Sequence, residues 1–471
     1  MKKIETFLKS KYYIGLIFII TLLAWSLNFE TKPHAFNLYN MILIYFLILS
    51  NALLLTLYKN TLYSVPIVFS ILFIINKPDI SFDTTGQLGF PIFAFLTFIF
   101  GYMGYFIRFK PKFKFRKFTL GLALIALSYV IPLIYTSFSL SALTVSMMGF
   151  VYLGLYLFYS NTMTGDLKYL FTIFLAVNIL LVYQVGYYIM MGYLQNPELP
   201  FVERLMMGWN RNFGWGNVND ICFYITITLP AYLYFIYRKP NSIWRWMIVI
   251  LPITAVILTK SRGGLLGLGI AFMGMILFTV KRGSKLSLWH IVTVLATLLV
   301  LGFIARGLLW EWMEFLLFKL ERGLDGFTSY RLFIYEHAWN IFLERPLFGS
   351  GWLSINRVAD AWLIEFEIAH RLFMYHSTVF QALAAMGIFG LVALCVHYFQ
   401  IFKYYLTDLK FEKSLFIIGY VATQVHGLIE NVQYSVPYSV IIVLVLAIFE
   451  TSTTNTLFKK VNERYELIQP R

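Results

Sequence analysis

Residues 376–402 read HSTVFQALAAMGIFGLVALCVHYFQIF, a stretch without any Asp, Glu, Lys or Arg residue. A helix of this length extends for about 40 Å at roughly 1.5 Å per residue, more than the approximately 30 Å of hydrocarbon in a bilayer. The apolar residues are continuous rather than alternating, which favours a helix over a strand of a membrane barrel. The stretch therefore predicts a transmembrane helix with a histidine at its start.

Similar apolar stretches recur along almost the whole chain. Hydrophobic residues make up 59% of the sequence and charged residues only 13%, a balance that excludes a soluble protein of this length. We expect an all-α fold, a polytopic transmembrane helix bundle of about 12–14 spans that forms one integral membrane domain over residues 1–471. The predicted spans are residues 12–28, 36–57, 61–76, 88–107, 118–136, 140–160, 169–191, 219–237, 244–259, 264–280, 288–307, 376–402, 414–430 and 433–450.

Basic residues indicate the orientation of this bundle. The formal net charge is +15, and a fourteen-span arrangement puts the basic clusters on one face, which the positive-inside rule makes cytoplasmic. Both termini are then cytoplasmic. We interpret the charge as topology and attraction to anionic membrane lipids, and we expect no nucleic-acid partner. The clusters lie within residues 2–11, 108–117, 238–245, 281–285, 403–413 and 459–464.

Two longer connections face the external side in this topology. Residues 192–219 contain Arg211 and end with Asn217-Val218-Asn219. Residues 308–375 are far longer than an ordinary connection, which indicates a function. The pattern of this loop predicts amphipathic helices, which can lie at the membrane interface and cover a cavity between spans. We expect them at residues 308–320, 329–345 and 356–373.

Two arginines are candidates for binding an anion at the external face. Arg262 stands in the sequence Ser261-Arg262-Gly263-Gly264, at the turn between two predicted spans. The glycines allow close approach of the backbone, and the guanidinium fork suits a phosphate group. Headgroup anchoring of a span end is the alternative interpretation. Arg331 begins an amphipathic stretch, and a solvated helix face is its alternative.

His376 is the candidate general base. It stands at the N-terminal end of a helix, where the helix dipole favours the neutral imidazole, and Ser377 beside it is a candidate N-cap. Glu430 is the next candidate for the catalytic base, one turn beyond His426 at the end of a predicted span. The alternatives are an interfacial polar histidine and an acid in an external loop. Gly387 and Gly390 are better explained by close helix packing.

The sequence contains no Asp-x-Asp pair and no His, Cys and Asp cluster with metal-ligand spacing. We therefore expect no metal and no other cofactor. Cationic side chains must then carry the charge of any leaving group.

The residues above resemble the family of O-antigen ligases and Wzy-type O-antigen polymerases, which are integral membrane glycosyltransferases with a lipid-linked donor. The resemblance lies within residues 214–430, and each motif is weak by itself, whereas the ordered set on one membrane face is more specific. The matching elements are His376-Ser377 followed after nine residues by Gly387-x-x-Gly390-Leu391, Arg262 with Leu266, Arg331 with Pro346-Leu347-Phe348-Gly349-Ser350-Gly351, and the Asn217–Asn219 turn.

This resemblance implies a GT-C-like, metal-independent, inverting transferase in a bacterial cell membrane. Its donor would be an oligosaccharide linked to undecaprenyl diphosphate at the external or periplasmic face, and its acceptor a glycan hydroxyl. Arg262 and Arg331 would hold the diphosphate, and His376 would accept the hydroxyl proton. Further candidates for substrate contacts are Arg211, Ser377 and Gly263.

Four functions remain open at this point. A polymerase joins repeat units, and a ligase transfers the finished glycan to a lipid A core. Abundant Phe, Ile, Tyr and Lys indicate an AT-rich genome, which is common in Gram-positive bacteria and favours the polymerase. A polysaccharide flippase would carry charges in the middle of its spans, whereas the notable charges here gather at one face. A structural role beside other polysaccharide-assembly membrane proteins is the last alternative.

Overall fold

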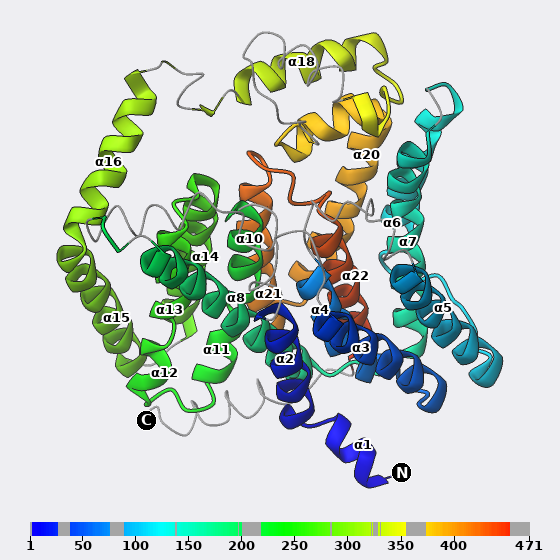
Figure 1. Ribbon diagram of the computed structural model, residues 1–471, viewed down its shortest axis with the longest axis horizontal. Coiled ribbons are helices and arrows are strands. Elements are labelled where there is room, and N and C mark those ends of the chain that lie inside the picture. Colours follow the sequence, from blue (N-terminus) through cyan, green and yellow to red (C-terminus); the bar gives the residue numbers. More distant parts are fainter. Residues whose placement is uncertain are drawn as a thin grey trace.

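The structure is a computed structural model in which every regular element of the described residues is a helix and none is a strand, as the sequence predicts. Figure 1 shows these helices packed into a bundle. The described residues are 2–26, 38–75, 89–136, 139–195, 197–199, 218–282, 285–321, 323, 328–329, 331–354 and 374–452.

The helices follow the order of the predicted spans. The first half contains α1 (Lys2–Leu8), α2 (Lys11–Ser26), α3 (Leu38–Leu57), η1 (Thr61–Ser64), α4 (Val65–Ile75), α5 (Gly89–Phe109), α6 (Thr119–Val130), η2 (Ile131–Ile134), α7 (Leu140–Thr162) and α8 (Leu167–Gln195). The second half contains α10 (Val218–Thr228), α11 (Ala231–Ile236), α12 (Ile243–Met247), α13 (Ile250–Leu258), α14 (Arg262–Arg282), α15 (Lys285–Ile304), α16 (Arg306–Glu321), α18 (Arg331–Glu344), η4 (Trp352–Ser354), α20 (Thr378–Leu406), α21 (Phe411–His426) and α22 (Val436–Thr451).

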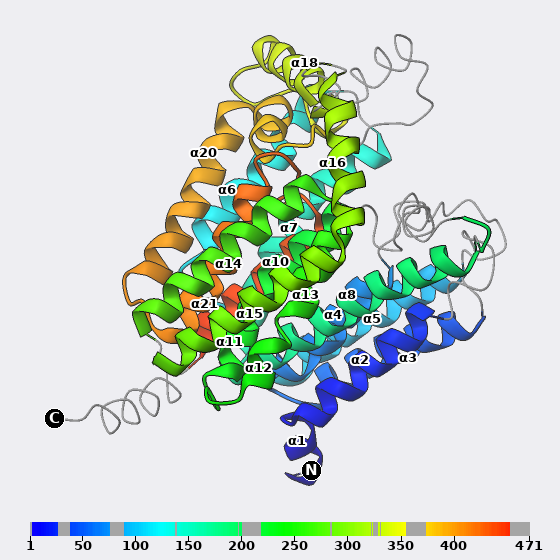
Figure 2. The ribbon, with the colours of Figure 1, turned by 90° about the vertical axis from the view of Figure 1, so that its left-hand side faces the viewer.

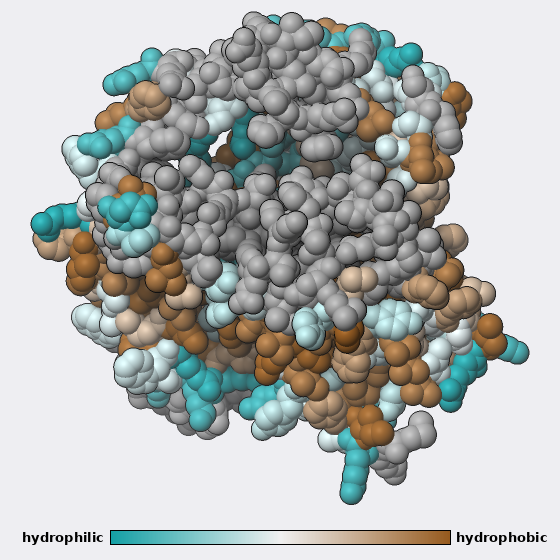
Figure 3. Space-filling model, in the orientation of Figure 1, coloured by the Kyte–Doolittle hydropathy of each residue, from teal (hydrophilic) through white to brown (hydrophobic). Residues whose placement is uncertain are grey.

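Helix length and composition make this a polytopic membrane protein. Among the described residues, six helices are long and apolar enough to cross a bilayer, and further apolar helices of 10–17 residues accompany them. Figure 3 shows exposed apolar residues across the lower half of one face, with hydrophilic residues at its edges and in the upper part. The six helices are Leu140–Thr162, Leu167–Tyr187, Val218–Ile236, Arg262–Lys281, Ser287–Ile304 and Thr378–Leu406.

Each of the fourteen predicted spans overlaps a helix, but several predicted boundaries are wrong. The span predicted at 414–430 ends at His426, so Glu430 lies in the following loop. The span predicted at 376–402 begins at Thr378, because His376 has a positive φ of 50° that a right-handed helix excludes. Helix α8 continues to Gln195 instead of ending at 191.

The two predicted external connections are described in part. Helix α16 follows α15 with one residue between them and corresponds to the predicted helix at 308–320, while α18 corresponds to the one at 329–345. Figure 2 shows α18 at the opposite end of the molecule from α1 and α12. The predicted helix at 356–373 lies outside the described residues, as do Arg211 and most of the connection at 192–219.

Helix α20 is broken in its first half, which the sequence did not predict. Gly387 has φ 64° and ψ −161°, and the backbone of residues 346–351 lies against the break. The amides of Ile388 and Phe389 donate to the carbonyls of Pro346 and Leu347 at 2.8 and 3.0 Å. In return, the carbonyls of two alanines of α20 accept from the amides of Ser350 and Gly351. The short segment thus satisfies the backbone groups that the break exposes.

The same contact places α18 on the bundle. The chain runs directly from α18 into residues 346–351, and the buried side of α18 packs on α20. Ile334, Ala338 and Ile341 of α18 form a small apolar cluster with Tyr375 and Ala384. Arg331, the first residue of α18, is therefore held in a fixed position relative to the start of α20.

We predict that Gly387→Ala destabilises the protein. A side chain at this φ and ψ costs on the order of 1–3 kcal/mol, and a Cβ atom would lie 2.6 Å from the backbone of Leu347. Thermal unfolding in detergent micelles should therefore show a lower melting temperature. Gly269→Ala is the matched control, because no atom lies within 4 Å of the added Cβ in helix α14. Equal melting temperatures for the two variants would contradict the broken helix.

Candidate active site

The carboxylate of Glu430 is the centre of a polar cluster beside the start of α18. Glu430 lies in the loop 427–435 between α21 and α22, and its exposed fraction is 5%. Its Oε2 accepts from Nη2 of Arg331 and from Nδ2 of Asn219, both at 2.8 Å. Its Oε1 lies 2.6 Å from Nδ1 of His376. Three segments that are distant in sequence thus meet at one buried acid.

The charge of this acid is set by its partners. Burial by itself raises the pKa of the Glu430 carboxyl, but the neighbouring His376 and Arg331 outweigh burial and lower that pKa to about 2. Glu430 is therefore ionised at neutral pH. A carboxylate only accepts hydrogen bonds, so Nδ1 of His376 carries a hydrogen, and Nε2 of a neutral ring holds the free lone pair.

His376 is held in an uncommon backbone conformation. Its φ of 50° is in the left-handed region, which costs roughly 1–2 kcal/mol for a residue with a Cβ atom. The hydroxyl of Tyr335 in α18 donates to the carbonyl of His376 at 2.8 Å. The preceding amide of Tyr375 donates to Oε1 of Gln381, which also accepts from Nδ2 of Asn431 at 3.1 Å. The turn before α20 is thus tied to α18 and to the Glu430 loop.

Arg262 lies close to this cluster at the start of α14. Its Nη2 donates to the hydroxyl of Ser329 at 2.9 Å, two residues before Arg331, and the two guanidinium groups are near enough to interact electrostatically. Arg331 also donates to the carbonyl of Ile429. Two fixed cations beside one carboxylate leave a net positive charge, which attracts an anionic ligand.

Asn219 connects the two parts of the site. Its Nδ2 binds Glu430, and its Oδ1 accepts from the hydroxyl of Ser261 at 2.5 Å. The same Ser261 oxygen accepts from the amide of Gly264 at 2.9 Å and so caps the first turn of α14. The helix that carries Arg262 is therefore linked through two side chains to the carboxylate that binds His376.

The glycines after Arg262 serve helix packing. A Cβ atom on Gly263 would lie 2.5 Å from the His426 ring, and one on Gly264 would lie 2.5 Å from Sγ of Cys222. The predicted close approach therefore occurs, and its partners are α21 and α10. The amide of Gly264 is already used by the cap.

The structure brings together four of the predicted residues, His376, Glu430, Arg331 and Arg262. Ser377 stands at the N-cap position of α20 with an extended backbone, but its side chain makes no capping hydrogen bond. Arg211 lies outside the described residues. No group of three or more metal-ligating side chains gathers among the residues that the structure describes.

Sequence reasoning missed the residues that hold the cluster together. Asn219 had a signal, because it ends the Asn217–Asn219 turn before a span. Ser261 belongs to the motif of Arg262 but was not assigned a role. Tyr335 and Gln381 have no signal in a single sequence, since their contacts depend on how α18 and the 427–435 loop approach α20.

The O-antigen ligase family matches residues 247–395. The matched range includes Arg262, Arg331 and His376, whereas Asn219 and Glu430 lie outside it. The resemblance predicted from the motifs is confirmed for this part of the chain, and it supports a membrane enzyme of the O-antigen ligase or polymerase type. No curated protein matches the chain.

We predict a pH-dependent effect of Glu430→Gln on stability. Because the pKa of Glu430 is lowered from 4.5 to about 2, its contribution to folding is complete above pH 4.5 and is lost as the pH falls toward 2. The wild-type melting temperature should fall across this range more steeply than that of the variant. At neutral pH the variant should melt at a lower temperature, because Arg331 then faces an uncharged amide.

Thermal unfolding of both proteins in detergent at several pH values measures this difference. Glu412→Gln is a suitable control, because that acid lies at the other end of α21. Parallel curves for the wild type and Glu430→Gln would contradict the ionised cluster.

Proposed function

We propose that the protein is a membrane glycosyltransferase that moves an oligosaccharide from undecaprenyl diphosphate to a glycan hydroxyl. Its most specific form is a Wzy-type polymerase of a surface polysaccharide in a bacterial cell membrane. The observation that carries the proposal is the contact of His376 and Arg331 with one buried carboxylate, with Arg262 beside them. A base and two cations at one site suit the transfer of a sugar from a diphosphate.

In this mechanism Nε2 of His376 accepts the proton of the acceptor hydroxyl. The hydroxyl oxygen attacks the anomeric carbon from the face opposite the diphosphate, the bond between that carbon and the phosphate oxygen breaks, and the configuration inverts. Undecaprenyl diphosphate leaves with its negative charge stabilised by Arg262 and Arg331. The side chain of His376 is 27% exposed, so the proton can pass to solvent afterwards.

Glu430 acts as a positioning residue in this proposal. Its three donors occupy both carboxylate oxygens, and its side chain is only 7% exposed. A pKa of about 2 also makes the carboxylate too weak a base for a sugar hydroxyl. The hydrogen bond to Nδ1 instead fixes the tautomer that leaves the lone pair on Nε2.

The proposed reaction takes place at the external face, with both termini in the cytoplasm. The support is the basic α12 segment at one end of the bundle and α18 at the other (Figure 2). A cysteine at Asn340, an exposed residue of α18, should react with an impermeant maleimide in intact cells of a strain whose protein lacks Cys222 and Cys395. Labelling only after permeabilisation would show that α18 faces the cytoplasm and would contradict the proposed topology.

A deletion strain tests the polymerase function. Loss of a polymerase should leave surface glycan as single repeat units, whereas loss of a ligase should leave long polymer attached to undecaprenyl diphosphate. Loss of a flippase should instead trap the lipid-linked repeat unit at the cytoplasmic face. Gel electrophoresis of the surface glycan and mass spectrometry of the lipid-linked pool distinguish these outcomes. Long surface polymer in the deletion strain would exclude the polymerase.

Two variants should separate donor binding from transfer. His376→Ala should keep donor affinity and lose transfer by a factor on the order of 10²–10⁴, because the general base is absent. Arg262→Ala should weaken donor binding and lower the rate by about 10²–10³, and Arg262→Lys should restore only part of it, because the fork is lost.

Purified protein with a lipid-linked oligosaccharide donor gives both quantities. Glu314→Ala on α16 is the control, because this exposed residue accepts a hydrogen bond from Trp310 of its own helix and lies outside the cluster. Full transfer by His376→Ala would remove this residue from the mechanism.

A further inference from the structure

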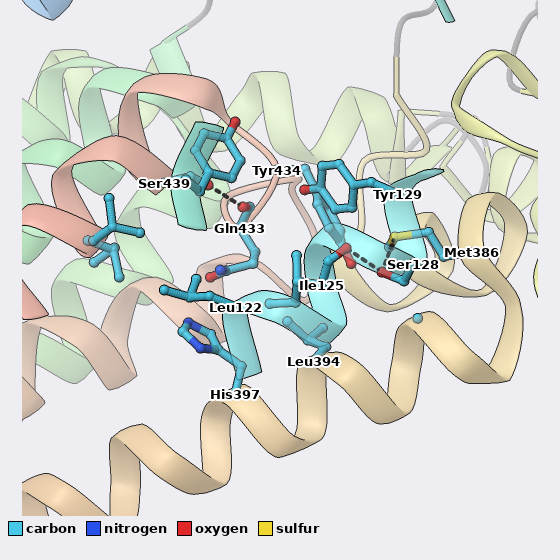
Figure 4. A pocket seen from close by; sticks show the side chains of 14 residues that line it. Leu122, Ile125, Ser128, Tyr129, Met386, Leu394, His397, Gln433, Tyr434 and Ser439 are labelled. Atoms are coloured by element: carbon cyan, nitrogen blue, oxygen red, sulfur yellow. Dashed lines mark hydrogen bonds between the residues drawn. The ribbon is translucent and has the colours of Figure 1, made fainter. Parts of the chain in front are cut away.

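A small cavity lies beside the loop that carries Glu430. Helices α6, α7, α20 and α22 surround it together with residues 433 and 434 of the loop. Its volume is about 20 Å³, which is enough for one water molecule. Figure 4 shows the His397 ring of α20 and the side chains of Gln433 and Tyr434 around this space. None of these three residues belongs to the proposed active site.

Several polar atoms of the lining have no hydrogen-bond partner among the described residues. They are both ring nitrogens of His397, Oε1 of Gln433 and the hydroxyl of Tyr434, and the exposed fractions of these residues are 1%, 7% and 5%. A buried polar atom without a partner is destabilising, because it has lost its hydrogen bonds to water and gained none in return. Such a group is therefore usually bonded to ordered water when no protein partner is present.

We propose that the cavity is an internal hydration site whose bound water bridges His397 to Gln433 and Tyr434. The water donates to Oε1 of Gln433 and exchanges hydrogen bonds with one nitrogen of the imidazole and with the phenol, which satisfies three of the four orphaned atoms. It thereby ties the 427–435 loop to the part of α20 beyond the break at Gly387. Gln433 follows Glu430 by three residues, so this water-mediated contact restrains the position of the Glu430 carboxylate. Its effect on catalysis rests on the function proposed above.

A second cavity of equal volume provides an internal comparison. It also measures about 20 Å³ but lies among Trp246, Phe272, Met275 and Ile291, and no polar surface is exposed in it. Nε1 of Trp246 is already bonded to the carbonyl of Pro240. An apolar cavity of this kind stays dry. The two cavities therefore differ in polarity at matched size.

Each cavity is lined by one buried methionine that can report on water. Met386 faces the polar cavity and is 2% exposed, with its sulfur 3.2 Å from the Ser128 hydroxyl. Met275 lines the apolar cavity and is 4% exposed. Brief X-ray irradiation of the full-length protein in nanodiscs produces hydroxyl radicals from bound water, and these oxidise adjacent side chains even when they are buried. Mass spectrometry then gives the oxidation rate of each methionine.

We expect Met386 to oxidise at least several-fold faster than Met275 in the wild-type protein. Equal, slow oxidation of both would show that the polar cavity is dry and would overturn the proposal without any variant. His397→Leu should lower the Met386 rate toward that of Met275, whereas His397→Gln should keep most of it. An unchanged rate in a folded His397→Leu protein would also count against the bridge.

The link to catalysis is tested separately. If the water restrains Glu430, His397→Leu should bind the lipid-linked donor normally and transfer about 10- to 100-fold more slowly, as expected for a displaced catalytic group. His397→Gln should recover most of the rate. A wet cavity with full transfer by His397→Leu would overturn the link to Glu430 and leave the hydration site intact. Absence of transfer by the wild type would instead refute the proposed function, while the oxidation result would stand.

Discussion

The ionised, buried carboxylate of Glu430 is the constraint on which the rest of the site depends. A buried charge is stable only when donors surround it, and here the donors come from three segments. Asn219 precedes Glu430 by 211 residues, Arg331 by 99 and His376 by 54. None of them can move away without leaving the charge undersolvated. The polar cluster therefore fixes the start of α10, the start of α18 and the turn before α20 in one arrangement.

The break in α20 is a second contact that holds α18 in this arrangement, in addition to the polar cluster. A continuous α20 would offer no free amides or carbonyls to residues 346–351, and α18 would then be joined to the bundle only through side chains. The break at Gly387 gives four backbone hydrogen bonds between the two segments. Arg331 and Tyr335 are carried on α18, so the backbone contact and the contacts with Glu430 and His376 support each other.

The sequence predicted the helices far better than the contacts between them. Continuous apolar stretches specify membrane helices by themselves, because the bilayer leaves few other conformations, and each predicted span overlaps a helix. His376, Arg262, Arg331 and Glu430 were each identifiable from residue type and motif. Their meeting at one carboxylate was not, since it depends on tertiary packing. The break at Gly387 was also hidden, because glycine in such a helix more often marks close packing than a positive φ.

The same contacts explain how one site can hold a base and two cations at once. Two guanidinium groups that lie close together repel each other. Glu430 offsets the charge of Arg331 and takes the hydrogen of Nδ1, so the imidazole keeps a defined tautomer beside the arginines. In the proposed reaction, negative charge grows on the diphosphate as the proton reaches Nε2. Arg262 and Arg331 stabilise the growing charge, and Glu430 stabilises the new imidazolium. In this proposal, the carboxylate therefore stabilises the site before the reaction and the charged base during it.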